Sequence, residues 1–259
     1  MNKDDYKKSI LRLALFTGEL MLSNGAETYR VDDSIVRICK SRGFNHVNVF
    51  TTPTAIIISD ERFDGYTFMK AIKNRGMNLE KVALLNNFSR EFVSNKSLSA
   101  EEGMEILKNI STKETYNMNL IYLCTGLGSA FFASIIGGND IVTFLCTTFT
   151  AIIGIITFDK MIALSSIPAF SSLVSSNIVA IIGILFVQFG FLKNPDMLIV
   201  GSIMPLLPGV AFIKGIRDLI SGDLISGVSR AFDATITAVA IACGVGLVLD
   251  IYIRFGGTF

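Results

Sequence analysis

Two stretches near the N-terminus carry apolar side chains three or four positions apart, as amphipathic helices do. They are residues 4–23 and 27–42. Asn24-Gly25 follows the first stretch and Gly43 follows the second, and both are helix-stop signals. The pattern therefore predicts two helices that begin a folded domain.

The pattern then changes to short runs rich in β-branched residues. Residues 46–52 and 54–60 flank Pro53, and residues 65–72 give a third run, so we expect three strands. Helical spacing returns over residues 79–93 and 99–110, and the second of these opens on Ser99-Ala-Glu-Glu, which resembles a capping box. The order ααβββαα predicts a small α+β domain of about 110 residues, long enough to bury a core of its own.

The rest of the chain is dominated by long stretches without charge. They run over residues 115–139, 141–158, 161–192, 197–213 and 234–249. A membrane-crossing helix needs about 17–25 mostly apolar residues. The third stretch is too long for one span, so Pro168 should break it into a short leading segment and a span near 170–191. The fifth is long enough if its helix starts near Ser226. We therefore expect five spans.

Charge divides the chain in the same place. Charged residues number 32 among residues 1–118 but only 13 among residues 119–259. We therefore predict a cytosolic α+β domain at 1–117, followed by an all-α integral membrane domain at 118–259. The net charge of +1 argues against a nucleic-acid-binding protein. Four cysteines without CxxC spacing and a single histidine argue against a disulfide framework, a metal site or a cofactor.

Loop charges predict the orientation. The N-terminal stretch is interrupted by Arg12 and Glu19, so it does not have the pattern of a secretory signal peptide. With the N-terminus inside, the internal connections hold more Lys and Arg than the external segments, as the positive-inside rule requires. We therefore expect a multi-pass inner-membrane protein with a cytosolic N-terminal domain and an external C-terminus.

Polar side chains within the apolar half are candidates to line a solute path. Thr143, Thr147 and Thr150 share one face of the second span, and Asn177 and Gln188 share one face of the third. Small and hydroxyl side chains also mediate packing between membrane helices. The pattern leaves both interpretations open.

A break and a cluster of charges follow. Pro205, Pro208 and Gly209 should interrupt the fourth span, and broken helices often build the substrate sites of transporters. Residues 214–233 then concentrate the charges of this half. The candidates for substrate binding or coupling there are Lys214, Arg217, Asp218, Asp223, Arg230 and Asp233. Arg230 and Asp233 can pair on one helix face as a gate, a carboxylate anchor or a coupling site, or both can lie at the cytosolic interface.

Three segments together resemble the threonine/serine exporter family. They are GELMLSNGAETYRVDDSIVRICKSRGF (18–44), VFTTPTAIIIS (49–59) and PLLPGVAFIKGIRDLISGDLISGVSRAFDA (205–234). The motif positions in the N-terminal domain are Gly25, Glu27, Thr28, Tyr29, Arg30 and Asp32. The sequence departs from the family pattern at Lys214, where relatives often have Asn, and at Asp233, where they often have Glu.

The resemblance implies a membrane exporter of small hydrophilic metabolites. A chain of this length with five spans resembles the larger subunit of the split members, which work with a smaller all-membrane partner and are associated with dicarboxylates such as succinate. Single-chain relatives are associated with threonine and serine. The partners expected are thus that smaller subunit, a second copy of this chain, a small-molecule substrate and the lipid bilayer.

Two other function classes compete with a gradient-driven exporter. A membrane-embedded enzyme would use the acidic positions near Glu27, but the sequence holds no GxSxG, HExxH or P-loop motif. We therefore predict no catalytic residues. A membrane-tethered sensor would use the N-terminal domain to bind a ligand, but would not need a broken polar span.

Overall fold

The computed structural model describes residues 3–62, 65–73, 76–113 and 116–257. They fall into two compact units. The first joins Met1–Glu114 with Ile213–Ala231, and the second joins Thr115–Phe212 with Phe232–Phe259. The domain limit predicted at residue 117 stays a prediction. The sequence did not indicate that residues 213–231 group with the N-terminal residues.

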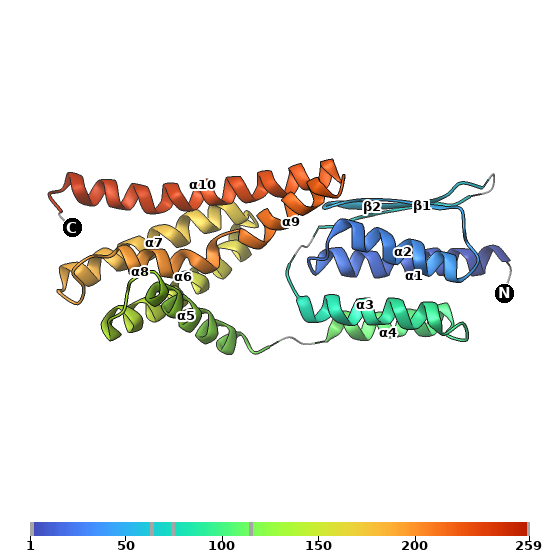
Figure 1. Ribbon diagram of the computed structural model, residues 1–259, viewed down its shortest axis with the longest axis horizontal. Coiled ribbons are helices and arrows are strands. Elements are labelled where there is room, and N and C mark those ends of the chain that lie inside the picture. Colours follow the sequence, from blue (N-terminus) through green and yellow to red (C-terminus); the bar gives the residue numbers. More distant parts are fainter. Residues whose placement is uncertain (1–2, 63–64, 74–75, 114–115, 258–259) are drawn as a thin grey trace. The chain divides into compact units, whose positions relative to one another are not determined.

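The first unit has the predicted order of elements. The helices are α1 (Lys3–Ser23), α2 (Thr28–Ser41), α3 (Leu79–Ser94) and α4 (Ala100–Thr112), and the strands are β1 (Val47–Thr52), β2 (Ala55–Asp60) and β3 (Thr67–Ala71). The strands pair antiparallel in the order β1-β2-β3. The sheet lies on the α1–α2 layer, and α3 and α4 form a third layer beyond it (Figure 1).

Helix α1 is the centre of this core because it contacts both neighbouring layers. Ile10, Leu11, Leu13 and Ala14 are all fully buried, so the helix buries more than one narrow stripe. Ser99 forms the predicted capping box with Glu102 at the start of α4. These contacts confirm the predicted α+β arrangement, while its cytosolic location stays a prediction.

The second unit is built from long apolar helices. They are α5 (Met118–Ile135), α6 (Ile141–Ser165), α7 (Pro168–Gln188) and α10 (Leu224–Arg254). Within the described residues these four are long and apolar enough to cross a membrane, and a fifth is counted if α8 (Asp196–Ile203), the 3-10 turn η1 (Met204–Leu206) and α9 (Gly209–Ile220) form one broken span. The predicted break at Pro205 and Pro208 is confirmed.

Two helix limits correct the sequence analysis. Helix α6 continues through Asp159 and Lys160 to Ser165, so residues 161–165 belong to it and not to a separate leading segment. Ser166 adopts a positive φ of 56°, and α7 begins directly at Pro168, the favoured first helical position for proline. Tyr122 donates a hydrogen bond of 2.9 Å to the Asp159 carboxylate, which satisfies this acid inside the helix.

Candidate functional site

Residues 213–231 form a helical hairpin, here named the charged hairpin. It contains the last part of α9, a turn and the start of α10. A Cβ at Gly227 would lie 2.7 Å from the Leu219 amide nitrogen and 2.8 Å from the Gly215 carbonyl oxygen. Only glycine permits this approach of two backbones. Gly222, with a φ of 91°, turns the chain between the helices.

The hairpin meets the chain where α1 ends. Gly25 adopts a φ of 88°, its amide donates to the Leu22 carbonyl, and the Ala26 amide donates to the Met21 carbonyl. This is a Schellman motif, and it confirms the predicted helix stop at Asn24-Gly25. The carbonyl oxygens of Gly25 and Ala26 accept hydrogen bonds from the hairpin.

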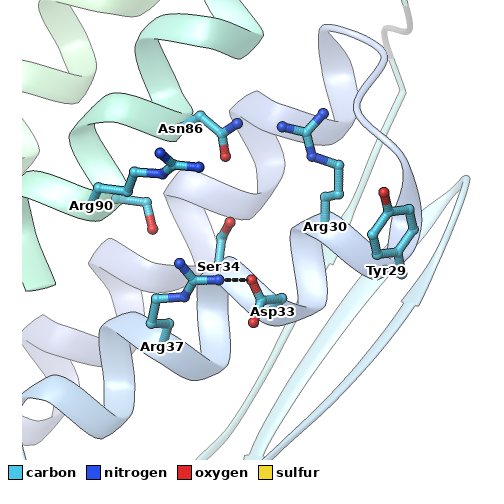
Figure 2. A pocket seen from close by; sticks show the side chains of 8 residues that line it. Tyr29, Arg30, Asp33, Ser34, Arg37, Asn86 and Arg90 are labelled. Atoms are coloured by element: carbon cyan, nitrogen blue, oxygen red, sulfur yellow. Dashed lines mark hydrogen bonds and ion pairs between the residues drawn. The ribbon is translucent and has the colours of Figure 1, made fainter.

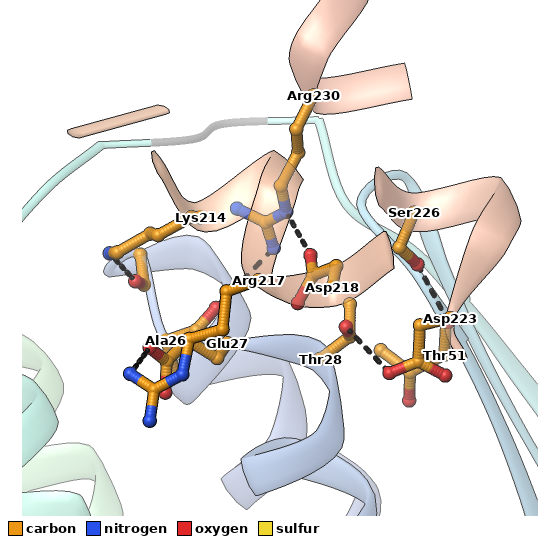
Figure 3. A network of polar contacts seen from close by, with 11 residues as sticks. Ala26, Glu27, Thr28, Thr51, Lys214, Arg217, Asp218, Asp223, Ser226 and Arg230 are labelled. Atoms are coloured by element: carbon orange, nitrogen blue, oxygen red, sulfur yellow. Dashed lines mark hydrogen bonds and ion pairs between the residues drawn. The ribbon is translucent and has the colours of Figure 1, made fainter. Parts of the chain in front are cut away.

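The first turn of α2 presents side chains to two different places. Tyr29 and Arg30 line a pocket shared with α3 (Figure 2). Glu27 and Thr28 contact the charged hairpin instead (Figure 3). Glu27 is the N-cap residue of α2, but its side chain forms no capping hydrogen bond. Its carboxylate pairs with Arg217 of the charged hairpin instead.

Five contacts join the hairpin to the N-terminal part of the first unit (Figure 3). Lys214 donates to the Gly25 carbonyl, and Arg217 Nη1 lies 2.6 Å from Glu27 Oε1. Arg230 Nη2 lies 3.4 Å from the Ala26 carbonyl oxygen. Two hydroxyl contacts complete the set: Thr28 donates to Asp223 at 3.3 Å, and Ser226 to the Thr51 carbonyl at 3.4 Å. The structure thus brings together two groups of residues that the sequence analysis treated separately.

Asp218 and Arg230 form a buried ion pair within this network. Arg230 Nε lies 3.0 Å from Asp218 Oδ2, and the two side chains are 16% and 0% exposed. Among the described residues, neither carboxylate oxygen of Asp218 accepts a well-oriented hydrogen bond. Taking a charge out of water costs several kcal/mol, and an ion pair offsets this fully only when the remaining lone pairs are also satisfied. The pair is therefore incompletely compensated.

Asp32 lies one turn beyond Thr28 on α2 and accepts a hydrogen bond from the Thr51 hydroxyl. Burial raises the pKa of this carboxyl to about 6, the Thr51 hydrogen bond lowers it, and the nearby Asp223 carboxylate raises it further. Like charges in a partly dry environment disfavour ionisation in this way. Asp32 is therefore a carboxyl that titrates close to neutral pH beside the network.

The remaining candidates lie in the second unit. Asp233 is exposed and follows the hairpin in α10. Its predicted partner Arg230 belongs to the first unit, where it pairs with Asp218. Pro205 lies in η1, and Pro208 directly precedes Gly209, the first residue of α9. Their proposed role in substrate binding or coupling stays a prediction.

The threonine stripe of α6 faces its neighbouring helices. Thr143, Thr147 and Thr150 are buried; Thr143 donates to Asp140, and Thr150 to its own helix at Cys146. Asn177 likewise donates to the α7 backbone, at the Leu173 carbonyl, while Gln188 is exposed at the end of α7. These contacts are those of packed helices, and they leave the path-lining role untested.

Sequence reasoning missed several polar residues. In the first unit it missed Thr51, whose carbonyl and hydroxyl both serve the network. In α7 it missed Ser171, Ser172, Ser175 and Ser176, all buried. The repeated Ser-Ser pairs four residues apart were a usable signal for a packing face. Ser175 confirms such a role, since it donates 2.6 Å to the Gly154 carbonyl of α6.

Comparison with known proteins agrees with the resemblance. The chain matches the family described as "Putative threonine/serine exporter" over residues 12–252. It is 23% identical over 254 residues, 96% of both chains, to the "Probable succinate transporter subunit YjjP" of Escherichia coli strain K12. The protein of the same description from Klebsiella aerogenes is 22% identical over 252 residues, 95% of both chains. No solved structure matches. With nearly its whole length inside the match, this chain belongs to the threonine/serine exporter family.

Proposed function

We propose that this chain is a membrane subunit of an exporter for small carboxylate-bearing metabolites, and that the Asp218–Arg230 pair is its gate. The family match and the apolar helices support a transporter. The relatives described as succinate transporter subunits favour a dicarboxylate, with threonine or serine as the alternative. The substrate must carry a carboxylate in either case.

The incompletely satisfied ion pair carries this proposal. A guanidinium presents a planar fork of donors that suits a carboxylate. A substrate carboxylate can therefore replace Asp218 on Arg230, because the Asp218 carboxylate accepts no well-oriented hydrogen bond among the described residues. The displaced Asp218, or Asp233 one turn beyond Arg230, would then accept a proton. Substrate entry would in this way be linked to proton movement.

Release of Arg230 would also loosen the hairpin. Its guanidinium contacts the Ala26 carbonyl as well as Asp218, so a shift of Arg230 toward substrate weakens two contacts at once. Lys214 and Arg217 would keep the hairpin near the Gly25 turn meanwhile. This arrangement gives the gate a closed state that one bound carboxylate can open.

We place the N-terminal domain in the cytosol, five spans in the inner membrane and the C-terminus outside. The charged hairpin then lies on the cytosolic side, since it belongs to the first unit. A reporter fused to the C-terminus should behave as external, and a cytosolic reporter would mean an even number of spans.

We further propose that export requires a small all-membrane partner subunit. Carriers with alternating access are commonly built from paired repeats, and five spans are few for that arrangement. The relatives described as subunits support a partner. Export by the purified chain alone would contradict this, unless the chain proves to work as a homo-oligomer.

The test is flux of labelled succinate and of labelled threonine in vesicles that contain this chain with its partner, with and without a pH gradient. Asp218→Asn and Arg230→Lys should reach the membrane but lose gradient-driven flux. Asp250→Asn is the matched control, because Asp250 pairs with Arg254 at an exposed position of the same helix α10. Wild-type flux in both gate variants would refute the gate.

The same vesicles separate the competing functions. A sensor would bind substrate without flux, and an enzyme would change the label chemically. Either result would overturn the exporter. Asp233→Asn tests the second carboxylate, since retained exchange without gradient-driven export would assign the proton to Asp233.

A further inference from the structure

A polar pocket lies between α2 and α3 in the first unit. Its volume is about 180 Å³, and Figure 2 shows its side chains. It is lined by Tyr29, Arg30, Asp33, Ser34, Arg37, Asn86, Ser89 and Arg90. None of these residues belongs to the charged hairpin, so the pocket is a different site from the proposed gate.

Positive charge exceeds negative charge in this lining. Arg37 pairs with Asp33, four residues before it on α2. Arg30 comes from α2 and Arg90 from α3, and Figure 2 shows their guanidinium groups extending across the pocket from opposite helices. Among the described residues, neither side chain forms a hydrogen bond or ion pair with an acid. Two guanidinium groups thus remain without a counter-charge.

The base of the pocket offers hydrogen-bond donors. Ser34 is 5% exposed and Ser89 is 3% exposed, and both residues line the pocket. Asn86 adds an amide beside them. A serine hydroxyl at the wall of a pocket can donate a hydrogen bond to a ligand oxygen. The donors and the positive charge together select an oxyanion.

We infer that this pocket binds a small dianionic oxyanion ligand, either a dicarboxylate or a phosphate group. One negative charge would lie on Arg30 and one on Arg90, because each guanidinium can bind an oxyanion through two parallel hydrogen bonds. The Ser34 and Ser89 hydroxyls would donate to the same oxygens. The volume of about 180 Å³ is large enough for a small dianion.

The ligand would act on the network through α2. Tyr29 lines the pocket, and the Arg217 guanidinium lies 5.6 Å from the centre of its ring. Arg217 in turn pairs with Glu27. A ligand that draws Arg30 and Arg90 together would fix the first turn of α2, which carries both Glu27 and Thr28. A ligand in the pocket would therefore act on the network through this turn, whatever the exporter carries.

Isothermal titration of the purified full chain in detergent micelles tests the site, with succinate, inorganic phosphate and chloride as probes at constant ionic strength. We expect saturable binding of a dianion and none of chloride. Arg30→Gln and Arg90→Gln should each weaken it by about tenfold to hundredfold, the range expected for a lost charged hydrogen bond. Ser34→Ala should weaken binding less.

Arg12→Gln is the matched control, because Arg12 is exposed on α1 and does not line the pocket. Tighter binding of succinate than of phosphate would identify a dicarboxylate, and the reverse would identify a phosphate group. Absence of saturable binding by both probes would overturn the inference. Succinate binding that survives Arg30→Gln and Arg90→Gln would also overturn it, by assigning that binding to the transport site.

Discussion

Removing the acid from the Asp218–Arg230 pair should open the charged hairpin. At a separation of 3.0 Å, two unit charges attract by about 5 kcal/mol when the effective dielectric constant is about 20. Desolvation of both groups offsets part of this attraction. Asp218→Asn leaves Arg230 charged and largely buried, and losing one partner of a buried pair costs about 3–5 kcal/mol. We therefore expect a loss of about 3 kcal/mol in the local free energy of opening.

Hydrogen exchange followed by mass spectrometry measures this quantity directly. The chain holds no tryptophan, so fluorescence would report the change poorly. A loss of about 3 kcal/mol corresponds to exchange about 100-fold faster over residues 213–231. Asp250→Asn, in an exposed pair of the same helix, should change the local free energy of opening by less than about 1 kcal/mol.

A second variant separates charge from packing. Asp218→Asn with Arg230→Gln removes both charges, so exchange should be slower than in Asp218→Asn alone. The reasoning is refuted if Asp218→Asn exchanges at the wild-type rate, or if the double variant is as fast as the sum of two independent losses. Either result would mean that the ion pair does not hold the hairpin.

Three further predictions concern the same unit. Gly227→Val should destabilise the hairpin by more than about 2 kcal/mol, because its Cβ would meet backbone atoms, whereas Gly246→Val in open space of the same helix should change hydrogen exchange little. Since burial raises the pKa of Asp32 to about 6, the folded state binds more protons than the unfolded state; stability of the first unit should fall as pH rises from about 4 to about 6, and Asp32→Asn should flatten that profile in thermal melts followed by circular dichroism. Glu27→Gln should cost about 1 kcal/mol in the same melts, because water screens the 58% exposed Arg217 although the Glu27 side chain is only 11% exposed, and a loss of several kcal/mol would contradict a screened pair.

Local chemistry made most of the first unit predictable. Gly25 and Gly43 adopt the positive φ that their positions as helix stops required, and Ser99 forms its capping box. The limits of α6 were harder, because Asp159 and Lys160 looked like a loop. A hydrogen bond from Tyr122, 37 residues away, keeps that acid in a helix, and such a contact leaves no mark on the local pattern.

The candidate site was likewise predictable only in part. The residue types of the network could be chosen from the sequence, since charges near a proline break are unusual in an apolar half. Their partners could not, because Glu27 and Arg217 lie 190 positions apart. The helix face formed by Arg30, Ser34 and Arg37 had the correct spacing for the pocket. This face could not be recognised as part of a pocket, because its opposite wall includes Arg90 of α3, which only the tertiary fold brings near.

The discontinuity of the first unit also sets an order for its synthesis. Residues up to 113 can fold early, but the donors to the Gly25 and Ala26 carbonyls, Lys214 and Arg230, are made 189 and 204 residues later. At about 5–20 residues per second, that delay lasts on the order of ten seconds or more. During this interval the helices of the second unit leave the ribosome while the first unit is still incomplete. Newly made chains therefore pass through a stage in which the α1–α2 corner lacks its contacts with the charged hairpin.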